Sequence, residues 1–196
     1  MKNLNKFYLL KRGILLGDQN YNYKIKSLLL QKLYSNYIYN YDQGFFFIKK
    51  AIELIVENSK NRNIILIYTP VKVLLKSSFS FKNIIFISDN WIPGSLSNLK
   101  TYKKYNTINI NKLPNLIILL NTSHLDNLDI LVEASSFSIP VIMMLPNNLK
   151  FDNLYYPIIG NNSNHKFLDF YSVLFFNSIL QGFFSEKFNQ KYVFKA

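Results

Sequence analysis

Apolar runs of strand length alternate along this chain with longer segments of helical periodicity. The runs are continuous, which is typical of parallel strands covered on both faces of a sheet. Because helical patterns lie between the runs, the order predicts βαβ units and an α/β domain. The expected strands are residues 63–68, 82–87, 116–120 and 141–145, with a shorter fifth segment at 156–159.

Three segments carry the apolar spacing of helices. Residues 45–59 place apolar side chains near one face and charged side chains elsewhere. Residues 126–137 open on polar residues that can cap an N-terminus. They end before Ile139-Pro140, where proline disfavours helical geometry in the preceding residue. Residues 167–184, rich in Phe and Leu, are the third expected helix.

Length and composition indicate one folded domain. The chain has 196 residues, of which 49% are hydrophobic, so it can bury a sizeable core. We expect a single domain over 1–196, with a basic N-terminal segment at about 1–40, a core at about 41–184 and a short C-terminal tail. Cysteine is absent, which excludes disulfides and thiolate metal sites. No run of about 18 apolar residues occurs, so no membrane span is expected.

The charge of the chain favours a polyanionic partner. There are 23 Lys and Arg against 11 Asp and Glu, giving a formal net charge of +12. Phosphate neutralisation by such cations supplies much of a protein's affinity for nucleic acid. A lysine excess that follows biased codon usage is the alternative, as is a solvated surface position for each lysine taken alone. The candidates for phosphate contact are Lys11, Arg12, Lys24, Lys26, Lys100, Lys103 and Lys104.

A convergent catalytic constellation is not found in the sequence. No glycine-rich phosphate loop follows the first strand run. His124 lies in Thr122-Ser123-His124-Leu125-Asp126, but adjacent residues of one loop rarely converge as a nucleophile, base and orienter must. We therefore predict no catalytic residue, metal site, cofactor or small-molecule substrate. The alternative is a small α/β enzyme or nucleotide-binding domain with a ligand at the carboxyl ends of the strands, which rests on fold analogy alone.

The segment around the only tryptophan has the form of a fixed signature, Asn90-Trp91-Ile92-Pro93-Gly94-Ser95-Leu96-Ser97-Asn98-Leu99-Lys100-Thr101. Further motifs follow at Leu113-Pro114-Asn115-Leu116, Glu133-Ala134, Ile139-Pro140-Val141 and Gly160-Asn161-Asn162. Together they resemble the small-subunit ribosomal protein S2 family, over about residues 13–182. The residues that carry the match are Gly13, Gly17, Trp91, Gly94, Asn98, Thr101, Glu133, Ala134, Pro140, Gly160 and Asn161.

The chain departs from the family pattern at several positions. In the segment Gly13-Ile14-Leu15-Leu16-Gly17-Asp18-Gln19, Leu15 and Asp18 replace both family histidines, so no role of those histidines carries over. Asn90 replaces the arginine before the tryptophan and removes a fork-shaped phosphate or carboxylate partner. The linker 102–112 is too short for the helical hairpin of bacterial-type members. We therefore expect the family's hairpin insertion to be missing.

The resemblance implies a flavodoxin-like, three-layer α/β/α sandwich with a mostly parallel sheet. It also implies a structural constituent of the small ribosomal subunit that binds small-subunit rRNA and neighbouring ribosomal proteins and is not an enzyme. Trp91, Gly94 and Asn98 would build the loop that presents the neighbouring lysines. Glu133 is expected at an ordinary exposed or half-buried helix position.

The compositional bias indicates an organellar gene. Asn, Lys, Ile, Tyr and Phe are abundant, as an A+T-rich coding sequence would give, and the first residues lack the Arg- and Ser-rich pattern of an import signal. Together with the trimmed family pattern, this leads us to expect a mitochondrial protein encoded in the organelle. A plastid origin is the alternative.

Overall fold

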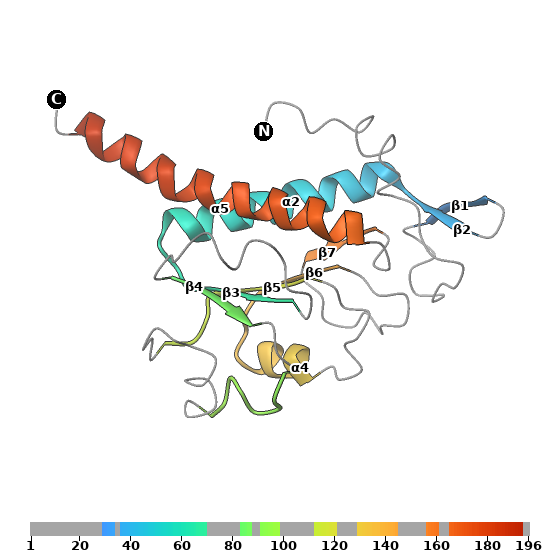
Figure 1. The fold of residues 1–196 in the computed structure, drawn as a ribbon, viewed down its shortest axis with the longest axis horizontal. Helices are drawn as coiled ribbons and strands as arrows, with labels where there is room; N and C mark the ends of the chain where they lie inside the picture. The colour runs from blue at the N-terminus through green and yellow to red at the C-terminus, as the bar shows by residue number, and fades with distance from the viewer. Residues whose placement is uncertain are drawn as a thin grey trace.

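The computed structural model describes a parallel sheet, the helices that cover it and an N-terminal hairpin (Figure 1). The described residues are 29–33, 36–69, 83–87, 91–98, 112–120, 129–144, 156–160 and 165–193. Along them lie β1 (Leu29–Leu33), β2 (Asn36–Tyr39), α2 (Tyr41–Lys60), β3 (Ile65–Tyr68), β4 (Ile84–Ile87), β5 (Leu116–Leu119), α4 (Asp129–Ser136), β6 (Val141–Met144), β7 (Tyr156–Ile158) and α5 (His165–Val193).

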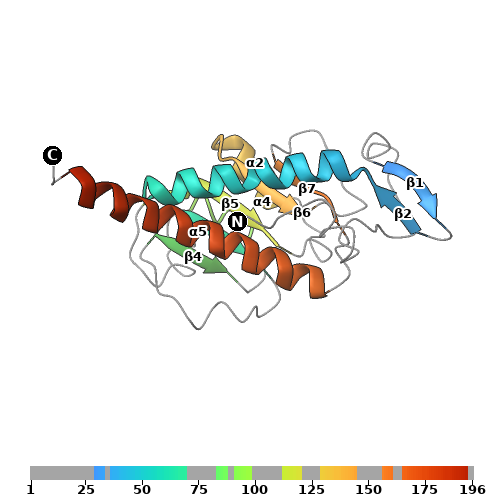
Figure 2. The same cartoon turned by 90° about the horizontal axis from the view of Figure 1, so that it is seen from above.

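Strands β3 to β7 form one sheet in which every described pairing is parallel. Their order, β4-β3-β5-β6-β7, is the 2-1-3-4-5 order of flavodoxin-like doubly wound sheets when β3 is counted as the first strand. Helices α2 and α5 pack together over one face, and α4 lies over the other (Figure 1; Figure 2). The predicted flavodoxin-like three-layer sandwich is confirmed.

The predicted strands are all present, with small differences at their ends. β3 to β7 each fall inside the expected range and are one or two residues shorter than it. The helix predicted at 126–137 corresponds to α4, and residues 126–128 lie outside the described part of the chain. Continuous apolar runs therefore located the sheet, because a strand buried on both faces needs an apolar side chain at every position.

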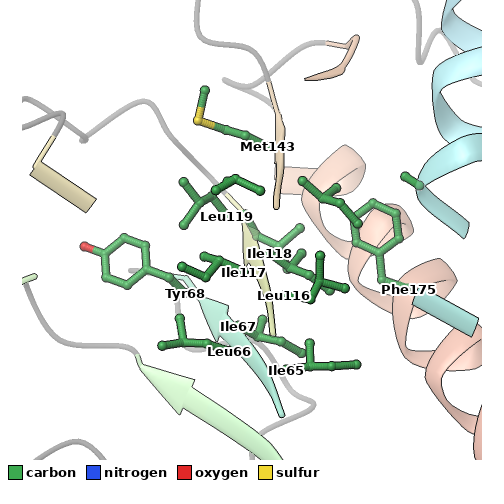
Figure 3. Close-up of a cluster of buried hydrophobic side chains, with 14 of the residues drawn as sticks. Ile65, Leu66, Ile67, Tyr68, Leu116, Ile117, Ile118, Leu119, Met143 and Phe175 are labelled. Atoms are coloured by element: carbon green, nitrogen blue, oxygen red, sulfur yellow. The ribbon is translucent and has the colours of Figure 1, made fainter. Parts of the chain in front are cut away.

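The core lies where these strands meet helices on both faces. Every residue of β3, β5 and β6 is buried. Figure 3 shows Phe175 of α5 on the side of the sheet to which Leu116 and Ile118 point. On the same helix, the buried Tyr171 hydroxyl donates to the Ile159 carbonyl at 3.2 Å. Burial raises the pKa of Tyr171 well above its usual range, so the hydroxyl remains a donor that ties α5 to the end of β7.

Asn115 aligns the first residues of β5 and β3. Its Oδ1 accepts from the Ile64 N–H at 3.1 Å, and its own N–H donates to the Ile64 carbonyl at 2.8 Å. The side chain therefore acts as an additional pairing group before the parallel ladder begins. This gives the asparagine of the motif Leu113-Pro114-Asn115-Leu116 a structural role.

Helix α2 begins earlier than its apolar spacing indicated, at Tyr41 instead of residue 45. Asn40 caps its N-terminus, since Asn40 Oδ1 accepts from the N–H groups of Asp42 at 3.0 Å and Gln43 at 3.5 Å. The first turn is thus stabilised by polar capping, which a search for apolar spacing does not detect.

Helices α2 and α4 both end in a Schellman motif whose left-handed residue is not glycine. After α4, the Ile139 N–H donates to the Ala134 carbonyl at 2.9 Å. The Ser138 N–H donates to the Ser135 carbonyl at 3.1 Å, and Ser138 has φ 55°. After α2, Arg62 occupies the same position, also at φ 55°. A side chain in this conformation costs about 1–2 kcal/mol, which glycine would avoid.

The end predicted for the helix at 167–184 is wrong. α5 continues through Gly182 to Val193, because Gly182 lies at a helix contact and not at a helix terminus. A Cβ on Gly182 would lie 2.5 Å from Ser59 Cβ and 2.6 Å from the Val56 carbonyl oxygen of α2. Glycine is therefore required where α5 meets α2. Although α5 is long, no helix among the described residues has the length and apolar character needed to cross a membrane.

Strands β1 and β2 form an antiparallel hairpin that the apolar pattern did not predict. Both strands are short, and polar residues interrupt them. At the base of the hairpin Tyr39 is only 2% exposed and belongs to the core, and Leu29 packs against that core. In both views the hairpin extends beyond the N-terminal end of α2, away from the five-stranded sheet (Figure 1; Figure 2).

We predict that Gly182→Ala lowers the free energy of unfolding by about 2 kcal/mol, because overpacking against a backbone carbonyl outweighs the better helix propensity of alanine. Urea denaturation followed by circular dichroism measures the change. Gln181→Ala, at the exposed neighbouring position, is the matched control and should change stability by less than about 0.5 kcal/mol. A Gly182→Ala protein as stable as the wild type would contradict the assigned contact.

We predict the opposite sign for Ser138→Gly, which should raise the free energy of unfolding by about 1 kcal/mol as the left-handed strain is relieved. Arg62→Gly should act in the same direction. Ser136→Gly, inside the last turn of α4, is the control and should lower stability by up to about 1 kcal/mol. Urea denaturation measures these changes as well. A Ser138→Gly protein less stable than the wild type would contradict backbone strain at residue 138.

Candidate functional site: the Trp91 loop and Glu133

Residues 91–98, termed the signature loop from here on, form a compact turn that follows β4 in the chain. The Ser95 N–H donates to the Ile92 carbonyl at 3.1 Å, and the Asn98 N–H donates to the Gly94 carbonyl at 2.8 Å. Gly94 has φ 82°, a left-handed conformation that glycine adopts without steric cost. The glycine of the motif is therefore required by the turn itself.

The carboxylate of Glu133 accepts three hydrogen bonds from the signature loop. Its Oε1 accepts from the Gly94 N–H at 2.6 Å and from the Trp91 indole N–H at 3.2 Å. Its Oε2 accepts from the Leu96 N–H at 2.8 Å. Hydrogen bonds to an ionised group are roughly twice as strong as neutral ones. One side chain of α4 thus fixes the conformation of a loop that follows β4.

Apolar packing holds the same loop against the sheet. Leu96 is 1% exposed, and Ser95 is fully buried. The Trp91 ring meets the Tyr68 ring edge to face, with the centroids 6.2 Å apart. Such pairs add about 0.5–1.5 kcal/mol beyond the burial of their area. Because Tyr68 is the last residue of β3, the signature loop lies at the carboxyl-terminal edge of the sheet.

The fold of α4 places Glu133 where the loop needs it. Ile130 and Ala134, one helical turn apart, are both fully buried and belong to the core. Their packing fixes the rotation of the helix, so that Glu133 lies beside the buried stripe. Beyond the Schellman motif, the Pro140 carbonyl accepts from the Ile117 N–H at 3.1 Å and aligns the start of β6 with β5. The motif residues Glu133, Ala134 and Pro140 therefore belong to one helix–turn–strand segment.

Glu133 lies at a half-buried helix position, one of the two expected environments, but its hydrogen bonds to the signature loop were not predicted. The residue is half-buried, because the N–H donors of a tight turn converge on its carboxylate. The sequence held one usable signal, since a turn around glycine leaves backbone donors that need an acceptor. The acceptor is 37 residues away from Leu96 along the chain, and only the fold brings the two together.

Besides Glu133 and Pro140, the structure places five signature residues, and the others lie outside the described part of the chain. Trp91, Gly94 and Asn98 lie in the signature loop, Ala134 lies in α4, and Gly160 is buried just after β7. The predicted residues that lie outside the described ranges are Lys11, Arg12, Gly13, Gly17, Lys24, Lys26, Lys100, Thr101, Lys103, Lys104 and Asn161. His124 and residues 102–111 of the linker also lie outside them.

Two comparisons with known proteins point to the same family. Residues 103–182 match the family model described as Ribosomal protein S2. The chain is 26% identical over 167 residues to the Small ribosomal subunit protein uS2m of Acanthamoeba castellanii, in an alignment that covers 82% of this chain and 52% of that relative. Both comparisons support a relationship to the ribosomal protein S2 family. It spans about half the length of the relative it matches.

The region that matches the S2 family model contains α4 with Glu133, strands β5 to β7 and α5 as far as Gly182. The signature loop precedes this region, yet its hydrogen bonds end on Glu133 within it. Direct contacts therefore join the Trp91 segment to the part of the chain that the S2 family model recognises. The family resemblance drawn from the motifs is confirmed.

We predict that Glu133→Ala lowers the free energy of unfolding by about 3 kcal/mol, because the Trp91 indole and two backbone N–H groups lose their acceptor. Trp91 is the only tryptophan, so its fluorescence reports on the loop directly. The emission should shift to longer wavelength as water reaches the ring. Glu57→Ala, on the exposed face of α2, is the control and should leave the spectrum unchanged. An unshifted emission spectrum in Glu133→Ala would contradict the role of Glu133 as the acceptor that fixes the signature loop.

Proposed function

We propose that this chain is a structural constituent of the small subunit of a mitochondrial ribosome, where it binds small-subunit rRNA and neighbouring ribosomal proteins in translation. The match of residues 103–182 to the S2 family model supports the ribosomal role. The relative from Acanthamoeba castellanii, named a small ribosomal subunit protein, supports the subunit, and its designation uS2m supports the mitochondrial location. The net charge of +12 fits a partner made of RNA.

The hydrogen bonds of Glu133 are the observation that carries the non-enzymatic part of this proposal. A doubly wound sheet offers a ligand site at the carboxyl ends of its strands, where a catalytic carboxylate would face the substrate. At this edge both oxygens of Glu133 instead accept from the signature loop. Their role is to fix a loop, so we propose neither a reaction nor a cofactor nor a small-molecule substrate.

We further propose that the signature loop and the basic N-terminal segment present cations to rRNA phosphates. A loop already fixed by hydrogen bonds loses little conformational entropy when it binds. Contacts with phosphates would orient the protein on the RNA without reading a base sequence. The proposed contacts are Lys11, Arg12, Lys24 and Lys26 in the N-terminal segment, and Lys100, Lys103 and Lys104 shortly after the loop.

Sucrose-gradient sedimentation of organelle lysate tests the role. We expect the chain, followed by mass spectrometry, to migrate with the small ribosomal subunit at moderate salt. Recombinant chain should bind a transcript of the small-subunit rRNA, and replacing Lys100, Lys103 and Lys104 with Gln should flatten the log–log salt dependence by about one unit for each lysine.

The matched control for that variant replaces Lys49, Lys50 and Lys60, three exposed lysines of α2, with Gln. It removes the same charge from a helix that also carries three acidic residues, so its salt dependence should stay close to that of the wild type. Equal slopes in all three proteins would refute the lysine assignment. Migration of the natural chain as a free small protein at moderate and high salt would overturn the ribosomal role.

A further inference from the structure

The β1–β2 hairpin has one face that changes from buried to exposed along its length. In the register of the two strands, Leu29 pairs with Tyr39 and Lys32 pairs with Tyr37. Tyr37 and Tyr39 are two residues apart on β2, so their side chains point to the same face of the ribbon. At the base that face packs on the core through Leu29 and Tyr39. Farther out it carries Lys32 and Tyr37.

Lys32 and Tyr37 form a cation–aromatic pair on this outer part. The Lys32 ammonium nitrogen lies 5.3 Å from the centroid of the Tyr37 ring. Lys32 is exposed and Tyr37 is half-buried. The two residues are direct cross-strand partners, a pairing that brings the ammonium within reach of the ring. The pair combines a cation with an aromatic surface beyond the N-terminal end of α2 (Figure 1; Figure 2).

The charge around this pair is positive without compensation in the sequence. Between residues 19 and 41 the chain contains no Asp or Glu, three lysines and six tyrosines. Helix α2 is balanced by comparison, because Asp42, Glu53 and Glu57 offset its three lysines. Residues 113–149, which include α4, contain no Lys or Arg at all. The described hairpin therefore lies in a segment whose charge complements a polyanion.

We propose that the outer part of this hairpin is an RNA-contact surface. In this surface the Lys32 ammonium pairs with a backbone phosphate, and the Tyr37 ring offers a stacking surface to an unpaired base. Stacking on aromatic rings combined with phosphate pairing is how proteins contact single-stranded and looped RNA. The inference rests on the proposed ribosomal function and adds to it a defined surface with two named contact residues.

The edge of the hairpin favours RNA over a protein strand that would extend the ribbon. The register of β1 shifts between Leu29 and Gln31, which interrupts the regular row of backbone groups that an added strand would need. Lysine in a short edge strand is a further feature that opposes strand addition. A contact through side chains, as RNA would make, does not need an unbroken edge.

Binding of the full-length chain to a transcript of the small-subunit rRNA, at salt concentrations between about 50 and 200 mM, tests the inference. Lys32→Gln should reduce the log–log salt slope by about one unit. Lys49→Gln, on the balanced surface of α2, is the matched control and should keep the wild-type slope. Tyr37→Leu should weaken binding about tenfold, within the range for loss of one base–aromatic stack, while the salt slope stays unchanged.

Tyr37→Phe keeps the aromatic ring and should bind like the wild type, which separates stacking from a general effect of substitution at this position. Circular dichroism must show that each variant folds. If the wild-type chain does not bind the transcript, the proposed function fails. If the wild type binds and Lys32→Gln keeps its slope, the hairpin surface alone is refuted.

A photo-crosslinking amino acid at position 37 in assembled subunits provides an independent measurement. Crosslinks to rRNA would support the surface. Crosslinks to a ribosomal protein alone would overturn it in favour of a protein partner.

Discussion

Three hydrogen bonds to one carboxylate determine how distant parts of this chain are joined. β4 is the edge strand of the sheet, whereas α4 connects β5 and β6 in the middle of it. The Glu133 side chain spans this distance and holds the loop after β4 by its backbone and by Trp91. Both oxygens of this carboxylate are engaged by the loop, so Glu133 serves the conformation of the loop.

Helices α2 and α5, on the face of the sheet opposite α4, are constrained by how closely their backbones pack. Gly182 allows the backbone of α5 to approach α2 more closely than any side chain would permit. This close layer covers one face of the apolar strands, and α4 covers the other. Tyr39 fixes the base of the N-terminal hairpin to the same core. A rigid centre thus supports two peripheral structures, the signature loop and the hairpin, which lie outside the sheet and are placed by it.

The sequence predicted the sheet well because its signal is local. Each strand is a continuous apolar run, and the structure shortens these runs by only one or two residues. Features that depend on contacts between distant parts of the chain could not be predicted from local sequence patterns. The role of Glu133 depends on the signature loop, which follows β4. The continuation of α5 beyond Gly182 depends on the contact of Gly182 with α2. The hairpin was missed because polar residues interrupt its two short strands. The motif resemblance identified Trp91, Gly94 and Glu133 as a set, but only coordinates show that they are hydrogen-bonded together.

Backbone geometry favours glycine at four positions in the described chain, and glycine is present at two of them. It is kept at Gly94, in the tight turn, and at Gly182, where a Cβ would meet a carbonyl that cannot move. Arg62 and Ser138 occupy the other two, at the ends of helices, where a side chain is tolerated at a moderate cost. Glycine codons begin with two guanines. A gene under pressure toward A and T would therefore replace glycine first at positions where another residue costs little stability. Non-glycine residues at these positions lower the stability of the free chain, and in the proposed ribosomal role a partner that binds only the folded state would restore it by mass action. Under that proposal, copies that fail to assemble would be the first to unfold and be degraded, so the amount of this protein would follow the supply of the rRNA.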